Sequence, residues 1–239
     1  MGETTGIAWT DATINFWQGC EKISPGCKFC YMFRDKKRYG QNPNVVIRSA
    51  PPTFNKPLLW AKDREKYAHI KRVFTCSWSD FFIEDADDWR DEAWDIIRRT
   101  PELTYQILTK RPERIMANLP ADFIEFDNVW LGISGENQEW LDKRMPDFYP
   151  NTYARVAFLS LEPLLGPINI IPYASFIDWV IVGCESGPSA RETNIEWVRD
   201  LQEQCYQASI PFFLKQLMVN GRLVETPELD GRKYVEFPR

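Results

Sequence analysis

Three cysteines lie close together near the start of the chain, at Cys20, Cys27 and Cys30, with the spacing C-x6-C-x2-C. Ser24, Pro25 and Gly26 separate the first two thiols and favour a turn, so we expect the segment to be a loop and not a helix. Three thiolates on one short loop can bind the same metal ion or the same cluster. The sequence therefore predicts a thiolate-ligated centre on this loop.

The number of thiols in the loop bears on which centre it could bind. A structural zinc site needs four ligands, and the chain contains no second C-x2-C pair. Iron–sulfur clusters are held by thiolates, and three of them leave one iron of a four-iron cluster free. This arrangement is similar to that of radical S-adenosylmethionine (SAM) enzymes, whose usual loop is C-x3-C-x-aromatic-C. Phe29 supplies the aromatic residue, whereas the first gap has six residues instead of three.

Length and composition limit the class of protein. The chain has 239 residues, of which 44% are hydrophobic, and this suits one α/β barrel-type domain or two small domains. The net charge of −5 argues against broad electrostatic binding of nucleic acid. The single histidine excludes a histidine-rich metal site. We expect a cytoplasmic protein without a membrane partner, because no apolar run reaches the length of a membrane span and the first residues lack the apolar core of a signal peptide.

Apolar runs typical of buried strands alternate with helical patterns along most of the chain. Strands are predicted at residues 14–17, 73–77, 104–109, 129–134, 155–161, 179–183 and 211–215, and helices at 31–39, 87–99, 112–119, 138–145 and 195–208. This alternation indicates parallel βαβ units. We predict an α/β fold with a partial or nearly closed parallel (β/α) barrel of about six to seven strands, forming one domain over residues 1–239. An irregular crossing is expected at 41–57 and a surface-wrapping tail at 218–239.

Polar side chains follow most of the predicted strands. Ligands of parallel α/β folds bind at the carboxyl ends of the strands. The predicted cofactor-binding residues are Phe29, Ser77, Ser79, Asp80, Lys110, Ser134, Glu136, Asn137 and Glu162, and the predicted catalytic residues are Cys184, Glu185 and Lys215. Any one of them could simply be solvated or cap a helix. Their convergence on the end of the sheet that also holds the cysteine loop favours a site.

The chemistry of these side chains suits SAM. Its amine requires a carboxylate or hydroxyl such as Asp80, and its carboxylate could pair with Lys110. Its ribose hydroxyls could bind Glu136 or Asn137. A thiol at Cys184 could donate a hydrogen atom to a substrate radical, although a cysteine there could equally pack as a small apolar residue.

Segments along nearly the whole chain resemble the phage-associated three-cysteine-motif proteins. The matching segments are Ala8–Thr13, Gly19–Tyr31, Gln106–Pro112, Leu159–Leu164, Val180–Gly187, Phe212–Gln216 and Leu229–Arg232. That family is regarded as radical-SAM-like, so the resemblance implies a [4Fe–4S] cluster on the three cysteines, SAM as the second cofactor, and a reductase or flavodoxin-type electron donor. It also implies a bacterial host cytoplasm and, as substrate class, nucleobases such as a modified thymine in phage DNA.

The basic runs at 36–38 and 62–72 could contact phosphates of such a substrate. Taken alone, either run is explained better by a solvated helix face. Two other functions also stay open. A barrel-type hydrolase would use Glu162 and Glu185 as a carboxylate pair, and its cysteines would be structural. A zinc-stabilised, non-catalytic binding protein would contain zinc without iron or sulfide.

Overall fold

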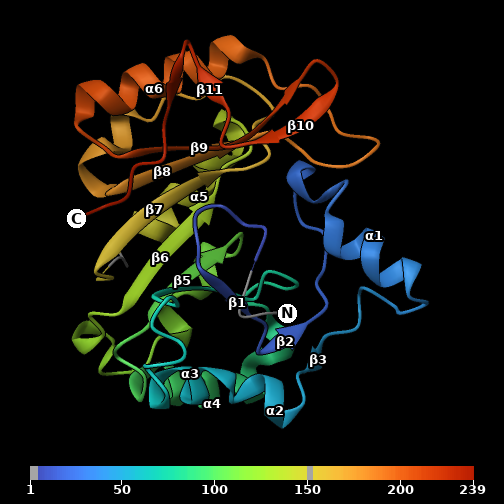
Figure 1. The fold of residues 1–239 in the computed structure, drawn as a ribbon, viewed down its shortest axis with the longest axis vertical. Coiled ribbons are helices and arrows are strands. Elements are labelled where there is room, and N and C mark those ends of the chain that lie inside the picture. The colour runs from blue at the N-terminus through green and yellow to red at the C-terminus, as the bar shows by residue number, and fades with distance from the viewer. Residues whose placement is uncertain (1–4, 150–152) are drawn as a thin grey trace.

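The computed structural model describes residues 5–149 and 153–239 (Figure 1). Its centre is one eight-stranded sheet with the order β1-β4-β5-β6-β7-β8-β9-β10. The strands are β1 (Ala12–Ile14), β4 (Arg72–Thr75), β5 (Thr104–Thr109), β6 (Val129–Ser134), β7 (Val156–Leu161), β8 (Trp179–Gly183), β9 (Phe212–Val219) and β10 (Arg222–Glu225). Neighbouring strands from β1 to β9 are parallel, and β10 is antiparallel to β9. The sheet curls into an open half-barrel, which confirms the expected α/β architecture and partial parallel barrel.

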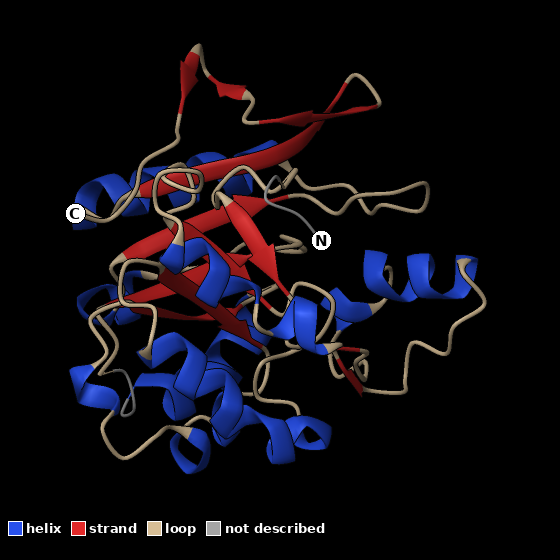
Figure 2. Cartoon of the chain, turned by 60° about the horizontal axis from the view of Figure 1, so that its bottom comes forward, coloured by secondary structure: helices blue, strands red, loops and turns tan. Residues whose placement is uncertain are grey.

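Helices cover the outside of this sheet and flank its open side. They are α1 (Tyr31–Arg38), α2 (Pro51–Phe54), α3 (Lys56–Lys62), α4 (Asp87–Arg98), α5 (Gln138–Phe148) and α6 (Ile195–Ala208). In Figure 1, α6 lies along β8 and β9, while α3 and α4 lie at the other end of the sheet. Figure 2 shows the strands between these two groups of helices. Across the described ranges, no helix has the length and apolar character needed to cross a membrane.

The two faces of each strand bury different side chains, because successive residues of a strand point to opposite faces. Along β7, Ala157 and Leu159 join the large core between sheet and helices. Phe158, between them, packs on the concave face in a smaller aromatic cluster with Trp9 and Trp179. The rings of Trp9 and Trp179 meet edge to face at 6.2 Å between centroids. This aromatic cluster fills the half-barrel from its amino-terminal end, so a cavity remains only nearer the carboxyl ends of the strands.

The segment at 41–57 is more regular than predicted. It contains β3 (Ile47–Arg48), which pairs with β2 (Trp17–Gln18), and then α2 and the start of α3. The prolines begin helices here and do not break them, since Pro51 and Pro57 stand in the first turns of α2 and α3. The first helical position needs no backbone N–H donor, so proline is tolerated there. The prediction of an irregular crossing was therefore wrong.

Three other boundaries also differ from prediction. The first strand is Ala12–Ile14, not 14–17, because Asn15 turns its side chain to the backbone N–H of Trp78. The predicted helix at 112–119 consists of two 3₁₀ turns, Pro112–Arg114 and Met116–Asn118. The tail at 218–239 is mostly exposed, as predicted for a surface segment, but it also contains β-structure: the end of β9, then β10, and the pair β11 (Glu228–Leu229) and β12 (Arg232–Lys233). Positive φ angles at Asn220 and Gly221 build the tight turn between β9 and β10.

Gly132 gives a test of the concave packing. A Cβ atom at this position on β6 would lie 2.5 Å from the ring of Phe158. Gly132→Ala should therefore overpack the aromatic cluster and lower the free energy of unfolding by roughly 1–3 kcal/mol, measured by urea denaturation. Gly6→Ala is the matched control, because no atom lies within 4 Å of a Cβ there. A second substitution, Phe158→Leu, should recover part of the loss. Equal stability of Gly132→Ala and Gly6→Ala would contradict this account of the packing.

Candidate functional site

A cavity of about 520 Å³ lies at the carboxyl ends of the strands, on the concave side of the sheet. Almost all of the residues predicted for the site line it. These are Cys20, Cys27, Phe29, Cys30, Ser77, Ser79, Asp80, Lys110, Ser134, Glu162, Cys184, Glu185 and Lys215. Glu136 and Asn137 are not among the lining residues. The parallel topology therefore brings together side chains that are far apart in sequence.

The three thiols of the cysteine loop face this cavity and form no disulfide. Cys27 ends a 3₁₀ turn at Pro25–Cys27, and Cys30 directly precedes α1. Burial, reinforced by the charge of Asp80, raises the pKa of the Cys20 thiol to about 12, although the positive charge of Arg111 opposes this. Thiols bind metals as thiolates, so binding would release their protons.

The arrangement of the thiols bears on the kind of centre that fits. In the described residues, no group of three or more Cys, His, Asp or Glu side chains is arranged to hold a metal ion. A single zinc ion requires four ligands at about 2.0–2.3 Å from one point. A four-iron cluster is wider, and each thiolate binds a different iron. The three unpaired thiols that line the cavity are the donor set that either kind of centre would use.

Glu136 lies beneath the cysteine loop and fixes it. The Ser24 hydroxyl donates a hydrogen bond to Glu136 Oε1 at 2.5 Å, and Arg144 Nη1 donates to Oε2 at 2.8 Å. Lys110 Nζ lies 3.7 Å from Oε1. Gly26 lets the loop approach, because a Cβ atom there would clash with the Glu136 side chain. The carboxylate is fully buried, so these contacts stand in for water.

The charges around Glu136 decide its protonation state. Burial raises the pKa of this carboxyl group, but the positive charges of Lys110 and Arg144 and the hydrogen bond from Ser24 outweigh it. The net pKa lies below the ordinary value, and the group is ionised at neutral pH. Its role in the structure is therefore to hold the loop, whereas the sequence suggested a contact with ribose.

Asn137 is also engaged by the protein. Its Oδ1 accepts a hydrogen bond from the backbone N–H of Trp140 at 3.1 Å and caps the first turn of α5. Asparagine is among the residues preferred at this position. The helix-capping alternative weighed for strand-end residues thus describes Asn137, and the cavity lining does not include it.

Asp80 joins the ends of two neighbouring strands. Its Oδ1 accepts hydrogen bonds from the Thr109 hydroxyl at 2.7 Å and the Phe82 N–H at 2.9 Å. Its Oδ2 accepts from the Lys110 N–H at 2.9 Å and lies 3.3 Å from Arg111 Nη1. The guanidinium of Arg111 also reaches Cys20 Sγ at 3.9 Å. Asp80 therefore orients an arginine toward the first thiol of the loop.

The two serines after β4 hold the same region in place. The Ser79 hydroxyl donates to the carbonyl oxygen of Gly19 at 2.6 Å, directly before the first cysteine. The Ser77 hydroxyl lies within hydrogen-bond distance of the Asn15 side chain. The Tyr31 hydroxyl donates to the Ser77 carbonyl at 2.6 Å. Sequence reasoning missed Tyr31 and Asn15; the position of Tyr31 next to Cys30 was the available signal.

The opposite wall of the cavity comes from β7, β8 and β9. Lys215 Nζ donates to Glu162 Oε2 at 2.6 Å, so these two predicted residues form an ion pair. Cys184 is buried beside them. Burial raises the pKa of its thiol to about 11, reinforced by the charge of Glu162 and opposed by that of Lys215. Cys184 therefore keeps its S–H bond at neutral pH.

Glu185 belongs to a separate ion pair that reaches the cysteine loop. Arg191 Nη2 donates to Glu185 Oε1 at 2.6 Å and to the carbonyl oxygen of Pro25 at 2.9 Å. Its guanidinium also lies over the ring of Phe29. Burial raises the pKa of Glu185, but the hydrogen bonds and charge of Arg191 bring it below its ordinary value. A lowered pKa keeps Glu185 ionised, which suits a nucleophile or general base and not a general acid.

Glu136 also yields a pH-dependent prediction. Glu136→Gln should lower the free energy of unfolding at pH 7 by roughly 3–5 kcal/mol, because it leaves buried cations without their counter-charge. The folded pKa lies below the ordinary value of 4.5. The contribution of the carboxylate is thus fully present above that pH and is lost as the pH falls through the folded pKa. Urea denaturation between pH 7 and pH 3 should show the gap between wild type and variant closing in acid.

The exposed residue Glu139 provides the control for that experiment. Glu139→Gln should change stability by less than about 0.5 kcal/mol at any of these pH values. A gap between wild type and Glu136→Gln that stayed constant down to pH 3 would show that the charge of Glu136 does not support the loop.

Comparisons with known proteins place the chain in one family. A family model described as "Protein of unknown function (DUF5131)" matches residues 4–238. No curated protein and no solved structure matches the chain. The family description carries no activity, so the function must be argued from the cavity and its thiols. Because the match extends over nearly the whole sequence, the chain belongs to this family of proteins of unknown function.

Proposed function

We propose that this protein is a radical SAM enzyme whose [4Fe–4S] cluster is held by Cys20, Cys27 and Cys30. The observation that carries the proposal is the position of three free thiols of one loop around a cavity at the carboxyl ends of parallel strands. When bound, such a cluster supplies the single electron that cleaves SAM to methionine and a 5′-deoxyadenosyl radical, which abstracts a hydrogen atom from the substrate. The proposed electron donor is a reductase or flavodoxin-type protein.

The chain's own residues contribute positioning and exclusion of water. Glu136 and Arg191 anchor the loop from below and from the side, through Ser24 and the Pro25 carbonyl. The guanidinium of Arg111 near Cys20 adds a positive charge that favours a thiolate. The aromatic cluster behind the cavity keeps water away from its inner end. These contacts suit a site in which a reactive carbon radical must meet only its substrate.

The residues that line the cavity indicate which side chains could contact SAM. Lys110 offers an ammonium group for a carboxylate, and Phe29 an aromatic face for adenine. Asp80, Ser77 and Ser79 reach the cavity but already hold protein partners, so a bound amine would have to share them. Glu136 and Asn137 keep their structural partners, and ribose contacts from them would require a rearrangement of the loop.

Cys184 is the proposed hydrogen-atom donor that closes the reaction. In that step its S–H bond breaks and the substrate radical gains a C–H bond. The resulting thiyl radical takes one electron from the electron donor and one proton from solvent, which restores the thiol. The raised pKa of Cys184 keeps the required S–H bond in place at neutral pH. Its alternative role as a small packing residue would leave the product unchanged in Cys184→Ala.

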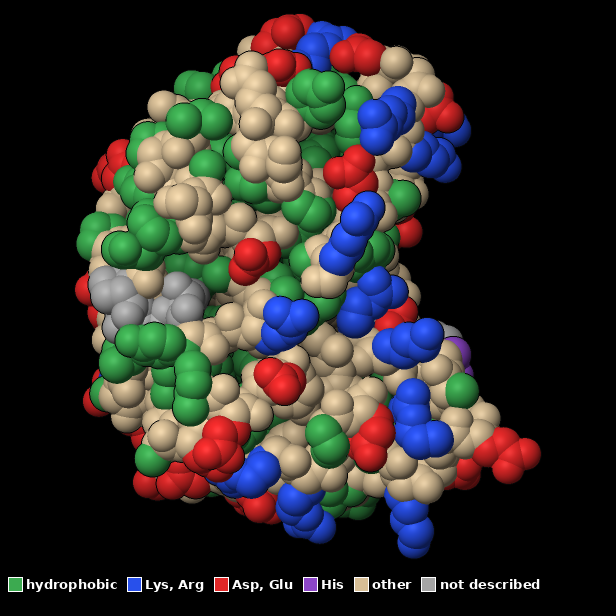
Figure 3. Space-filling model, turned by 90° about the vertical axis from the view of Figure 1, so that its left-hand side faces the viewer, with side chains coloured by type: hydrophobic (Ala, Val, Ile, Leu, Met, Phe, Trp, Pro, Cys, Tyr) green, Lys and Arg blue, Asp and Glu red, His purple; other side chains and the backbone are tan. Residues whose placement is uncertain are grey.

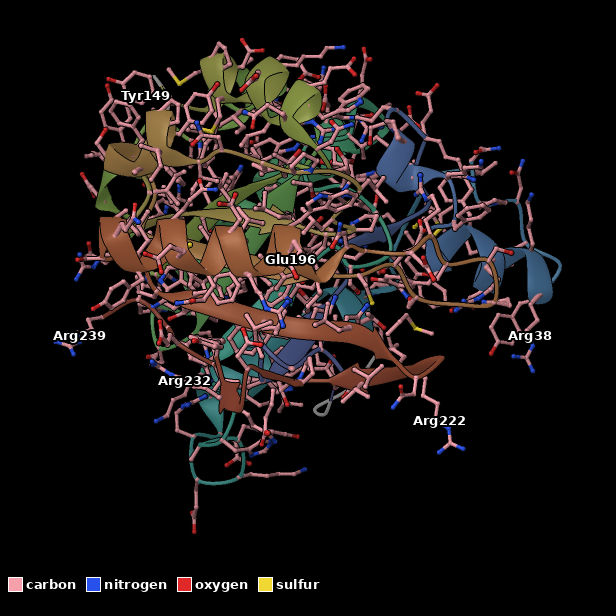
Figure 4. All side chains as sticks on the ribbon, turned by 90° about the horizontal axis from the view of Figure 1, so that it is seen from above. Arg38, Tyr149, Glu196, Arg222, Arg232 and Arg239 are labelled. Carbon is pink, nitrogen blue, oxygen red and sulfur yellow. The ribbon has the colours of Figure 1, made fainter. Side chains whose placement is uncertain are left out.

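The proposed substrate class is a nucleobase, such as a modified thymine in phage DNA within a bacterial host cytoplasm. Figure 4 shows Arg38 at the end of α1 and Arg222 on β10 projecting on the same side of the molecule. Lys36 of the same basic run is buried and cannot contact a phosphate. On the face in Figure 3, acidic and basic side chains are mixed, with Lys and Arg gathered beside a hollow in the outline. This distribution supports local contacts with phosphates over broad attraction.

The cluster can be tested directly. Anaerobically reconstituted protein should contain about four irons and four sulfides per chain and absorb near ~400 nm. Substituting Ala for Cys20, Cys27 or Cys30 should lower the iron content and abolish reductive cleavage of SAM to 5′-deoxyadenosine. Cys205→Ala is the matched control, because Cys205 is a buried free cysteine of α6 that does not line the cavity.

The same measurements separate the alternatives. Zinc without iron or sulfide would favour the zinc-stabilised binding protein. Colourless, metal-free protein would contradict the proposed cluster and favour the hydrolase. Full iron and full SAM cleavage in Cys20→Ala would show that the first cysteine, with its six-residue gap, does not belong to the site.

A further inference from the structure

The ion pair between Glu162 and Lys215 spans a strand that lies between them. Glu162 directly follows β7, and Lys215 is on β9, with β8 in the middle of the three strands. Gly183, the last residue of β8, makes this possible, since a Cβ atom there would already lie 3.3 Å from the Glu162 carboxylate. A larger side chain at that position would crowd the space through which Glu162 reaches Lys215.

This pair keeps hydrogen-bonding capacity that the protein does not use. Within residues 5–149 and 153–239, Glu162 Oε1 is buried without a hydrogen-bond partner. The ammonium group of Lys215 carries three hydrogens and has one recorded bond, to Glu162 Oε2. The hydroxyl groups of Ser134 and Ser160, on neighbouring positions of β6 and β7, are also buried without a partner in this part of the chain. All four residues line the cavity.

The charges of Glu162 and Lys215 limit which ligand groups could form hydrogen bonds with them. An anionic group on Lys215 would lie beside the Glu162 carboxylate, and a cationic group on Glu162 would lie beside the Lys215 ammonium. Like charges this close disfavour each other. A neutral group with one donor and one acceptor on adjacent atoms avoids both repulsions. Its N–H can donate to Glu162 Oε1 while its carbonyl oxygen accepts from Lys215 Nζ.

Aromatic side chains also form part of the lining of this cavity. Trp9 and Phe74 line it, with 4.6 Å between their ring centroids, and expose 2% and 8% of their surfaces. Aromatic side chains pack favourably against flat, polarisable rings. A flat ring that carries an –NH–C(=O)– edge therefore matches both walls. Among the building blocks of nucleic acids, this edge occurs in uracil and thymine and in the 6-oxopurines.

We propose that Glu162 and Lys215, placed across Gly183, recognise the –NH–C(=O)– edge of a nucleobase whose ring packs against the part of the lining formed by Trp9 and Phe74. This inference rests on the proposed function, since it names the substrate group that the radical chemistry would act upon. It assigns Lys215 to recognition of the base, where the sequence suggested a catalytic role. The charge pair binds the edge and remains an ion pair.

Binding to the full-length reconstituted protein, without reductant and therefore without turnover, tests the proposal. Calorimetry should detect thymidine or guanosine, and the stronger of the two identifies a pyrimidine or a purine source of the edge. 3-Methylthymidine lacks the N–H but keeps the ring and both carbonyl groups. It should bind at least about tenfold more weakly than thymidine, because a hydrogen bond to a charged group contributes about 1.5–3 kcal/mol. For a purine source, 1-methylguanosine takes its place.

Variants of Glu162 and Lys215 provide an independent test of the proposed base recognition. Lys215→Met should weaken thymidine or guanosine binding by about tenfold or more, whereas Glu196→Gln, in an exposed ion pair of α6, should have no effect. The double variant Glu162→Lys with Lys215→Glu keeps an ion pair if single variants fold poorly, and it should bind the methylated and unmethylated nucleosides equally. Equal binding of both nucleosides by wild type, or no binding at millimolar concentration, would overturn the proposal.

The outcomes also separate this inference from the proposed function. Iron, sulfide and SAM cleavage without discrimination between the nucleosides would keep the radical chemistry and remove the base-recognition site. Discrimination in a protein that holds no iron would keep the recognition site and remove the radical chemistry.

Discussion

The buried carboxylate of Glu136 is the interaction on which the site depends. Its two oxygens connect the cysteine loop, through Ser24, to Arg144 on α5. A buried charge is tolerated only when it is paired and hydrogen-bonded, so the loop, the helix and Lys110 must all be in place for the carboxylate to be stable. This mutual requirement couples the geometry of the thiols to the packing of the barrel. The loop is thus held by the fold itself.

Several of the cavity residues act in pairs that serve the thiols indirectly. Asp80 orients Arg111 toward Cys20, and Glu185 orients Arg191 toward the Pro25 carbonyl. In each case a carboxylate fixes an arginine, whose flat guanidinium group then contacts the loop with defined geometry. In the part of the chain that the structure describes, Glu162 and Lys215 bond to each other and make no hydrogen bond to the loop. The cavity therefore has one wall that supports the thiols and another that remains available for a ligand.

Sequence patterns predicted the sheet well and the detailed roles of its polar residues poorly. The apolar runs at 104–109, 129–134 and 179–183 coincide with β5, β6 and β8, because strands buried on both faces leave a continuous signal. The convergence of strand-end residues also followed, since parallel strands share one carboxyl edge. Sequence could not show that Glu136 points beneath the loop while Ser134, two residues earlier, faces the cavity. That distinction depends on where the chain leaves the sheet.

The prediction of an irregular crossing at 41–57 differs from the structure for a related reason. Its prolines favour irregular structure when only the sequence is considered, but at Pro51 and Pro57 their fixed φ angles suit the first turn of a helix. Tyr31 was overlooked because its hydroxyl group finds its partner, the Ser77 carbonyl, 46 positions away in the chain. Long-range partners of this kind have no local signature.

The contact between Arg191 and the Pro25 carbonyl has a consequence for how the protein is made. These residues are separated by 166 positions along the chain. During synthesis from the amino terminus, the cysteine loop leaves the ribosome long before Glu136, and longer still before Arg191. Domains fold as units, so the three thiols spend most of translation without the residues that anchor and cover them. A nascent chain thus exposes these three thiols before the residues that hold their loop in place have been made.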